Sequence, residues 1–380
     1  MNKIYADHAA TTKISETAKQ AMIACMDEYY GNPSSLHTVG QQAAEQLLKA
    51  RETVADLLGA DPKEIYFTSG GSEADNQAIL SAAYFGKKNG KNHIISTTFE
   101  HHAVLHTLKK LEKEGFEVTL LDVHENGIVT PEQVADAIRE DTALVTIMYA
   151  NNEIGTIQPI REIGAICRGK EVPFHTDAVQ AVGHIPVNVE KDNIDMLSLS
   201  GHKFRGPKGV GLLYARKGMP LVNVIEGGAQ ERGKRAGTEN LPAIVGMVAA
   251  LQEATENMEQ EAPRISAMRD QLIEGLSQIP RSRLNGDRER RLPGTVNFVF
   301  EGVEDEMLLL QLDARGIAAS SGSACTAGSL EPSHVLLALG LPTEIARGSL
   351  RLSIGAENTL EEMEYIIKSV KEVVAQLRGE

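Results

Sequence analysis

The chain has 380 residues, 42% of them hydrophobic, which is enough to bury one large core or two unequal ones and excludes the disordered class. Its formal net charge of -14 disfavours direct nucleic-acid binding as the main activity, because affinity for phosphate backbones comes mostly from a basic face. No apolar run approaches the roughly 20 residues that span a bilayer, and the N-terminal MNKIYADHAATT contains no apolar signal segment, so we expect no membrane partner and a cytoplasmic protein.

Short apolar strands alternate with amphipathic helices through the first two thirds of the chain. The strand candidates are EIYFTS (64–69), HIISTT (93–98), EVTLLDV (117–123), ALVTIMYA (143–150), EVPFHTD (171–177), MLSLS (196–200) and GVGLLYA (209–215). Their spacing is typical of an α/β fold with a mostly parallel sheet. We therefore predict one large α/β domain over residues 15–253.

The pattern changes from about Glu253. A charged helix (262–279) is followed by strand candidates TVNFVF (295–300) and LRLSIG (350–355), and a final helix begins at Thr359. This indicates a smaller α+β domain, formed by residues 1–14 and 254–380. The DHAATT segment (7–12) could pack with that domain or lie near the functional site.

Polar residues follow several of these strands, at the edge where open α/β sheets bind ligands. After the first strand, Gly71 and Ser72 open a helix whose free N–H groups suit a phosphate, although an ordinary capped turn is the alternative reading. Asp177 and Gln180 follow another strand, where an aspartate is often only a cap. Lys203 follows Ser-Gly-His, and a desolvated lysine there would be a nucleophile able to form a Schiff base.

A phosphate-binding turn, an aspartate for a pyridinium nitrogen and a lysine for an aldehyde together are what pyridoxal 5′-phosphate requires. No one of the three is specific alone. Their occurrence in one chain, each after a strand, favours a cofactor site over separate structural roles.

The segment SSGSACTAGS (320–329) surrounds a single cysteine with small residues. It has little apolar bulk to bury, so we expect a mobile loop, at about 320–335, with Cys325 exposed. Cys25 and Cys167 lie in helical patterns and are expected to be small core residues; the three cysteines form no disulfide framework or CxxC pair. A metal site built from His101, His102 and His106 is disfavoured, because no carboxylate or thiol stands at ligand spacing, and we expect no metal.

A whole series of segments resembles the cysteine desulfurases, of the aminotransferase class-V type. In order they are DHAATT, YGNPSSLH, FTSGGSEADN, EHHAV, NNEIGTIQPI, HTDAVQAVG, SLSGHKFRGPKG, ERGKRAGTEN, NGD, SSGSACTAGSLEPSHVL and GSLRLSIG. The cysteine-bearing segment is typical of the class I branch, which has the long loop. The resemblance implies the fold of pyridoxal-phosphate-dependent aminotransferases (fold type I), a homodimer, and conversion of L-cysteine to L-alanine with sulfur held on Cys325 as a persulfide.

The resemblance also implies roles for single residues. Lys203 would form the Schiff base with the cofactor and move protons, and Asp177 would face the ring nitrogen. His101 would stack on the ring as a catalytic group, and Gln180 would bond the phenolic oxygen. The phosphate would be bound by Gly71, Ser72, Ser200, His202 and, from the other subunit, Thr238. Asn152, beside the cofactor, and Arg351 would hold the substrate carboxylate. A structural histidine and a strand-end salt bridge remain the alternatives for His101 and Arg351.

The acceptor of the sulfur stays open. Several relatives continue past the last helix into a tail that docks an iron–sulfur scaffold, whereas this chain ends after VAQLRGE. The partner is therefore expected to be either an iron–sulfur scaffold or a tRNA-thiolation enzyme, without direct contact to tRNA. The alternative functions are a selenocysteine lyase or aminotransferase of the same fold, neither of which needs Cys325, or a sulfur carrier that has lost the cofactor.

Overall fold

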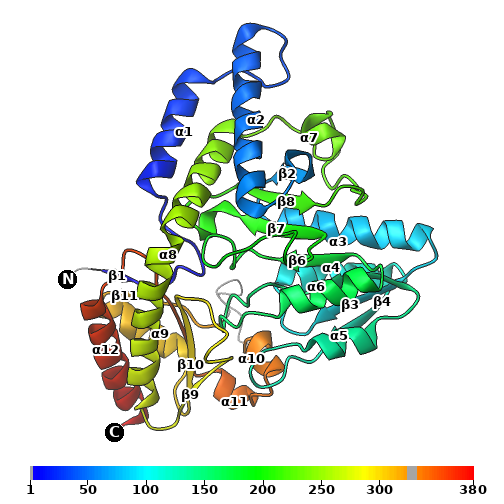
Figure 1. The fold of residues 1–380 in the computed structure, drawn as a ribbon. Helices are drawn as coiled ribbons and strands as arrows, with labels where there is room; N and C mark the ends of the chain where they lie inside the picture. The colour runs from blue at the N-terminus through cyan, green and yellow to red at the C-terminus, as the bar shows by residue number, and fades with distance from the viewer. Residues whose placement is uncertain (1–2, 323–331) are drawn as a thin grey trace.

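A computed structural model describes residues 3–322 and 332–380. Its largest layer is a seven-stranded sheet in the order β2-β8-β7-β6-β5-β3-β4 (Figure 1). The strands are β2 (Ile65–Thr68), β3 (His93–Thr97), β4 (Glu117–Leu121), β5 (Thr142–Thr146), β6 (Phe174–Asp177), β7 (Met196–Ser200) and β8 (Gly211–Ala215). Only β8 runs antiparallel to its neighbours, so the predicted mostly parallel sheet is confirmed. Six of the seven strand predictions contain an observed strand, and the seventh (143–150) overlaps β5, which begins one residue earlier.

Helices cover both faces of this sheet. The pair α3 (Gly71–Lys88) and α4 (His102–Lys113) packs on one face, and the pair α5 (Pro131–Ala137) and α6 (Ile160–Gly169) packs on the other. This division follows from right-handed crossovers: α3 and α4 lead toward the β4 edge of the sheet, whereas α5 and α6 lead back from it. The buried strands between the two layers are apolar over most of their length, as a doubly covered sheet requires.

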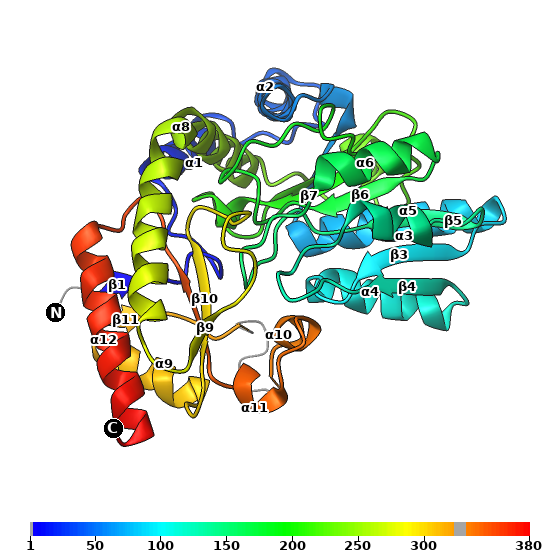
Figure 2. The ribbon, with the colours of Figure 1, turned by 60° about the horizontal axis from the view of Figure 1, so that its bottom comes forward.

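A second, separate core lies beside the C-terminal segments. It is built on the antiparallel sheet β12-β10-β9 and the parallel pair β1-β11, which helices α9 and α12 cover (Figure 2). The bounds are β1 (Ile4–Tyr5), β9 (Ser282–Leu284), β10 (Thr295–Phe300), β11 (Ile317–Ala318), β12 (Ser349–Ser353), α9 (Asp305–Ala314) and α12 (Leu360–Arg378). Since β1 pairs with β11, the N-terminal segment joins the C-terminal core.

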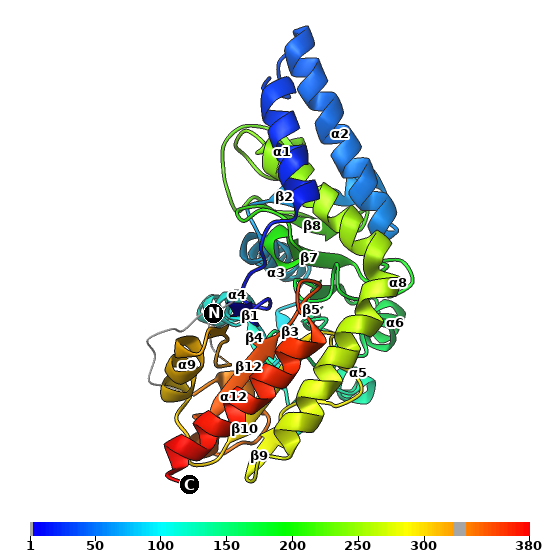
Figure 3. The same ribbon diagram turned by 90° about the vertical axis from the view of Figure 1, so that its left-hand side faces the viewer.

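One long helix, α8 (Leu241–Ser277), belongs to both cores. Its first half packs in the large core through Met247 and Leu251, and its second half packs in the smaller core through Met268 and Leu272. Figure 3 shows α8 running from the projecting pair α1 (Glu16–Glu28) and α2 (Thr38–Leu58) down to α12. The predicted domain boundary at 253 falls inside this continuous helix, and the division into two domains remains a prediction.

The remaining elements are short: η1 (Pro62–Glu64), η2 (Gly201–Lys203), α7 (Gln230–Gly233), α10 (His334–Ala338) and α11 (Thr343–Ala346). Cys25 and Cys167 are 2% and 0% exposed, which confirms both as core residues. Within the described part of the chain, no helix is long and apolar enough to cross a membrane.

Candidate active site

A cavity of about 380 Å³ opens at the carboxyl edge of the large sheet. Ten of the twelve residues predicted for the site line it: Gly71, Ser72, His101, Asn152, Asp177, Gln180, Ser200, His202, Lys203 and Arg351. Most of them directly follow or end a strand of the large sheet, whereas Arg351 reaches the cavity from β12 of the second core. The fold therefore brings together residues that lie up to 280 positions apart, from Gly71 to Arg351.

The turn between β2 and α3 presents free backbone N–H groups at one end of the cavity. Gly70, the residue before α3, gives the helix no side-chain cap, so the ordinary capped turn is not what the structure shows. A Cβ at Gly71 would lie 2.6 Å from Val179 Cγ2, so only glycine lets the backbone approach so closely. Ser72 and Ser200 line the same cavity. This end of the cavity can hold an anion.

Lys203 ends the turn that follows β7. Its Nζ donates hydrogen bonds to the carbonyl oxygens of Ala9, at 2.5 Å, and Ala10, at 3.0 Å, and Gln180 Nε2 also donates to Ala9 O, at 3.1 Å. The DHAATT segment packs with the second core through the bridge between Asp7 and Ser353, and its Ala9 and Ala10 line the cavity, so both of its expected placements hold.

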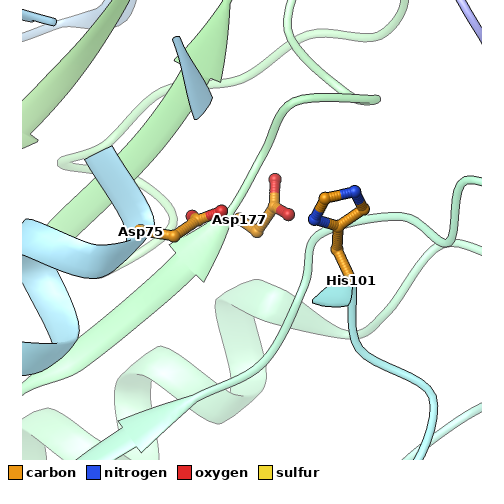
Figure 4. A group of neighbouring side chains, drawn as sticks. All are labelled: Asp75, His101 and Asp177. Carbon is orange, nitrogen blue, oxygen red and sulfur yellow. The ribbon is translucent and has the colours of Figure 1, made fainter. Parts of the chain in front are cut away.

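Three ionisable side chains stand close together inside the cavity: Asp75, Asp177 and His101 (Figure 4). Each offers an atom within 4.8 Å of the others, a spacing that would also admit a metal ion. Asp177 Oδ1 accepts a hydrogen bond from the N–H of Val179, and His101 Nδ1 accepts one from the N–H of Ala103. One possible ligand atom of Asp177 and one of His101 are therefore already hydrogen-bonded to the backbone. The expected absence of a metal remains a prediction.

Burial governs the protonation of this group. It raises the pKa of Asp177 to about 6, and together with the charge of Asp177 it raises the pKa of Asp75 well above its usual range. Burial, and then the Lys203 amine, lower the pKa of His101 to about 4, which keeps the imidazole neutral. A cation placed against Asp177 would reverse the first of these shifts, because it favours the carboxylate form.

His101 and His202 both have structural contacts as well as cavity-facing positions. His101 is the N-cap of α4, through the Ala103 contact, and His202 Nδ1 lies 3.1 Å from Thr11 Oγ1. One ring nitrogen of His101 therefore has the structural role of a helix cap, and the ring also lines the cavity.

Arg351 sits on β12 and is 2% exposed. Its Nη1 donates to Asn152 O at 3.1 Å and its Nη2 donates to Asp7 Oδ1 at 3.0 Å, while Nε has no hydrogen-bond partner. The guanidinium therefore forms a salt bridge, which was the structural alternative for this residue. Its Nε–H, in the cavity wall, is still available to donate a hydrogen bond. A carboxylate ligand is the natural partner for such a group.

Sequence reasoning assigned no role to four further polar residues of the cavity, namely Asp75, His102, Glu153 and His334. All four lie within the quoted segments FTSGGSEADN, EHHAV, NNEIGTIQPI and SSGSACTAGSLEPSHVL, and the available signal was that each has an ionisable side chain. Burial raises the pKa of Glu153 to about 7, although the hydroxyl of Ser333 and the Arg351 guanidinium both lower it. His102 stacks between His106 and His334.

Two predicted site residues are not among the described residues that line the cavity. Thr238 is exposed, as a residue expected to serve another subunit would be, and its role stays a prediction. Cys325 lies outside the described residues, as does most of the loop predicted at 320–335.

Comparison with known proteins agrees with this geometry. The family model of aminotransferase class-V matches residues 4–366. A cysteine desulfurase IscS of Methanosarcina thermophila is 53% identical, over 99% of this chain and 93% of that protein. The structure of a NifS-like protein superposes with a TM-score of 0.92 at 40% identity, covering 98% of this chain and all of the other. SspA, solved in complex with cysteine, gives a TM-score of 0.82 at 39% identity over 94% of this chain and 100% of that one.

The fold, the strand-end cavity and full-length identity lead to one assignment. The class-V aminotransferase fold is confirmed. This chain belongs to the cysteine desulfurases of the class-V aminotransferase family, which are enzymes dependent on pyridoxal 5′-phosphate.

Proposed function

We propose that this protein removes the sulfur of L-cysteine, releases L-alanine, and holds the sulfur on Cys325 as a persulfide for an acceptor protein. One observation carries the proposal: Lys203, Asp177 and Arg351 line a single cavity. An amine nucleophile, a buried carboxylate and a buried guanidinium there match the needs of the cofactor and of an amino-acid carboxylate.

The residues of the cavity fit pyridoxal phosphate. The uncapped start of α3, with Gly71, Ser72, Ser200 and His202, would hold the phosphate. Asp177 would pair with the ring nitrogen, since a buried carboxylate whose pKa is raised by burial is stabilised by a positive partner. Against the ring, His101 would stack on one face, and Gln180 would reach its phenolic oxygen. When bound, the cofactor withdraws electrons from the substrate's α-carbon, which makes the bond between its β-carbon and sulfur breakable.

Residues of the chain would bind and orient the substrate. Arg351 would take the carboxylate with its unpartnered Nε and the neighbouring Nη atoms, and Asn152 would help to fix it. Lys203 would move the proton at the α-carbon, because its amine is the base held on this side of the cavity.

Sulfur passes from the substrate to Cys325 in one displacement step. The Cys325 thiolate attacks the substrate sulfur, an S–S bond forms and the bond between Cβ and sulfur breaks. The electron pair of the broken bond stays with the β-carbon, which gains a proton and becomes the methyl group of alanine. The sulfur is oxidised as the β-carbon is reduced, so the step needs no outside oxidant.

The protein that accepts the sulfur is proposed to act in iron–sulfur cluster assembly or in tRNA thiolation.

We also propose a homodimer, since α1, α2 and the loop between them project from the molecule and expose apolar side chains such as Met26, Tyr30 and Leu36, which are 51%, 76% and 92% exposed. Cys25 and Cys167 are unpaired thiols, which suits the reducing cytoplasm.

Cys325→Ala tests the sulfur step. The variant keeps Lys203, Asp177 and Arg351, so L-cysteine should still change the cofactor's absorbance, while release of alanine and sulfide should nearly cease even with a strong reductant present. In the unchanged protein, cysteine should add the mass of one sulfur to the Cys325 peptide and none to those of Cys25 and Cys167. Near-normal alanine release by Cys325→Ala would instead favour a selenocysteine lyase or aminotransferase.

A further inference from the structure

Glu153 is a buried carboxylate in the wall of the cavity, and its backbone is fixed on both sides. Its N–H donates to Asn151 Oδ1 at 2.8 Å, and its carbonyl oxygen accepts from Asn297 Nδ2 at 3.2 Å. With 3% exposure and two backbone anchors, Glu153 has little freedom to move. Its carboxylate is therefore a fixed point between the large sheet and β10, which carries Asn297.

The carboxylate touches two residues that are distant in the sequence from Glu153 but close to each other in space. Ser333 Oγ donates a hydrogen bond to Glu153 Oε2, and it accepts from the N–H of Val335, at 3.1 Å, at the start of α10. Gly322 lies against the same oxygen, since a Cβ built there would stand 2.4 Å from Glu153 Oε2 and 3.1 Å from Ser333 Cβ. These two contacts flank the ten residues that include Cys325.

The same carboxylate adjoins the substrate side of the cavity. The Arg351 guanidinium is near enough to lower the pKa of Glu153, and both residues line the cavity together with Gly322. In the sequence, Cys325 comes three residues after Gly322 and eight residues before Ser333. Holding both ends of a segment raises the effective concentration of a group that it carries.

We propose that Glu153 is a positioning residue that ties Gly322 and Ser333 to the substrate wall and thereby speeds the transfer of sulfur to Cys325. This inference rests on the proposed function. Glu153 does not contact the reacting sulfur in this role and takes no part in binding the cofactor. Its effect should therefore fall on the transfer step and spare the binding of L-cysteine.

The experiment compares four changes in the holoenzyme: Ser333→Ala, Gly322→Ala, Glu153→Ala and the double change at 153 and 333. Sulfur on the Cys325 peptide is timed by mass spectrometry in a single turnover, and L-cysteine affinity is measured from the cofactor's absorbance. Each single change should slow transfer by about tenfold or more, since small misplacements of a reacting group cost this much. The affinities of Ser333→Ala and Gly322→Ala should stay within about threefold of the unchanged enzyme.

Two controls separate positioning from stability. Glu153→Gln keeps an acceptor for the Ser333 hydroxyl and should recover most of the transfer rate, and Thr130→Ala removes a comparable helix cap at α5 and should leave the rate unchanged. The double change should be no slower than the slower single change, because both break one contact.

Transfer at the normal rate in Ser333→Ala and Gly322→Ala would overturn the inference, as would equal losses of rate and affinity. These two variants decide the matter even where Glu153→Ala fails to fold. If the unchanged enzyme places no sulfur on Cys325, the proposed function fails first, and the inference fails with it.

Discussion

The two walls of the cavity are built in different ways. On the sheet wall, Asp177 and Lys203 stand at or just after the ends of adjacent strands β6 and β7 and are placed by the sheet itself. On the opposite wall, Arg351 bonds to Asp7, 344 residues away, and Ser333 bonds to Glu153, 180 residues away. The first wall comes from one sheet, whereas the second joins strand β12 of the small sheet to the rest of the cavity through a few side-chain contacts.

The two walls therefore have different functions. The sheet wall holds the groups that need a constant geometry toward the cofactor, and strand ends provide it. The opposite wall holds the groups that meet substrate and the ends of the cysteine-bearing segment. Damage to the first wall should abolish the chemistry, and damage to the second should change affinity or transfer by smaller factors.

Lys203→Ala should have the largest effect, because it removes the one lysine among the described cavity residues. Alanine release should fall by about four orders of magnitude or more, as when a nucleophile is deleted from other enzymes. Borohydride treatment with pyridoxal phosphate should label the Lys203 peptide in the unchanged protein and nothing in the variant. The exposed Lys208, in the same loop, gives the matched control: Lys208→Ala should remain active. A labelled, active Lys203→Ala protein would end the assignment.

The two walls also differ in how far they could be predicted from the sequence. Lys203, Asp177 and Gly71 were found because each follows an apolar strand, and parallel strand ends must meet at one edge. The roles of Arg351 and Thr238 came only from the resemblance. The contact between Glu153 and Ser333 could not be foreseen, because nothing local in either segment specifies its distant partner.

Helix α8 shows the same limit in the fold. The change in composition near Glu253 indicated a new domain, but helical periodicity continues across it, and Pro263 is tolerated inside the helix. The cores do not follow the predicted bounds throughout, because Val335 and Leu336, from the part predicted as the small domain, pack in the large core. The division into two domains therefore remains a prediction, and composition gave no sign that one helix serves both cores.

Arg351→Lys tests the substrate wall, where a smaller loss is expected. Lysine keeps the charge but lacks the planar fork that holds a carboxylate and the bonds to Asp7 and Asn152. We expect kcat/KM for L-cysteine to fall by about 10- to 100-fold, mostly through a higher KM, because one or two charge-assisted hydrogen bonds are lost. Arg347→Lys, the same change at an exposed position, should have no effect. A loss confined to kcat would place Arg351 in the chemistry instead.

Thr238→Ala tests whether another subunit contributes a residue to the cofactor site. Its cofactor affinity should fall by about tenfold, from the loss of one hydrogen bond to a charged group. Mixed in equal amounts with Lys203→Ala chains, it should form heterodimers with one doubly altered site and one intact site. At a cofactor concentration too low to fill the Thr238→Ala site, activity should rise toward about one quarter of that of the unchanged enzyme, because about half of the dimers are heterodimers and each has one intact site of two. Mixtures no more active than the separate variants, or an active monomer on sedimentation, would contradict a shared site.

The smallest effect tests whether the two cores unfold as one unit. Each has a helix begun by a capping box: Thr130 with Gln133 opens α5 in the large part, and Thr359 with Glu362 opens α12 in the small part. Thr130→Ala and Thr359→Ala should each lower the free energy of unfolding by about 1 kcal/mol, since each removes a side chain that accepts from a helix N–H group. Because α8 runs through both cores, we expect a single urea transition that both changes shift equally, with Thr→Ser at each site as the control that keeps the hydroxyl. If instead two transitions appear and each change moves only one of them, the contacts across the cavity are too weak to couple the cores, and the substrate wall can move as a separate body.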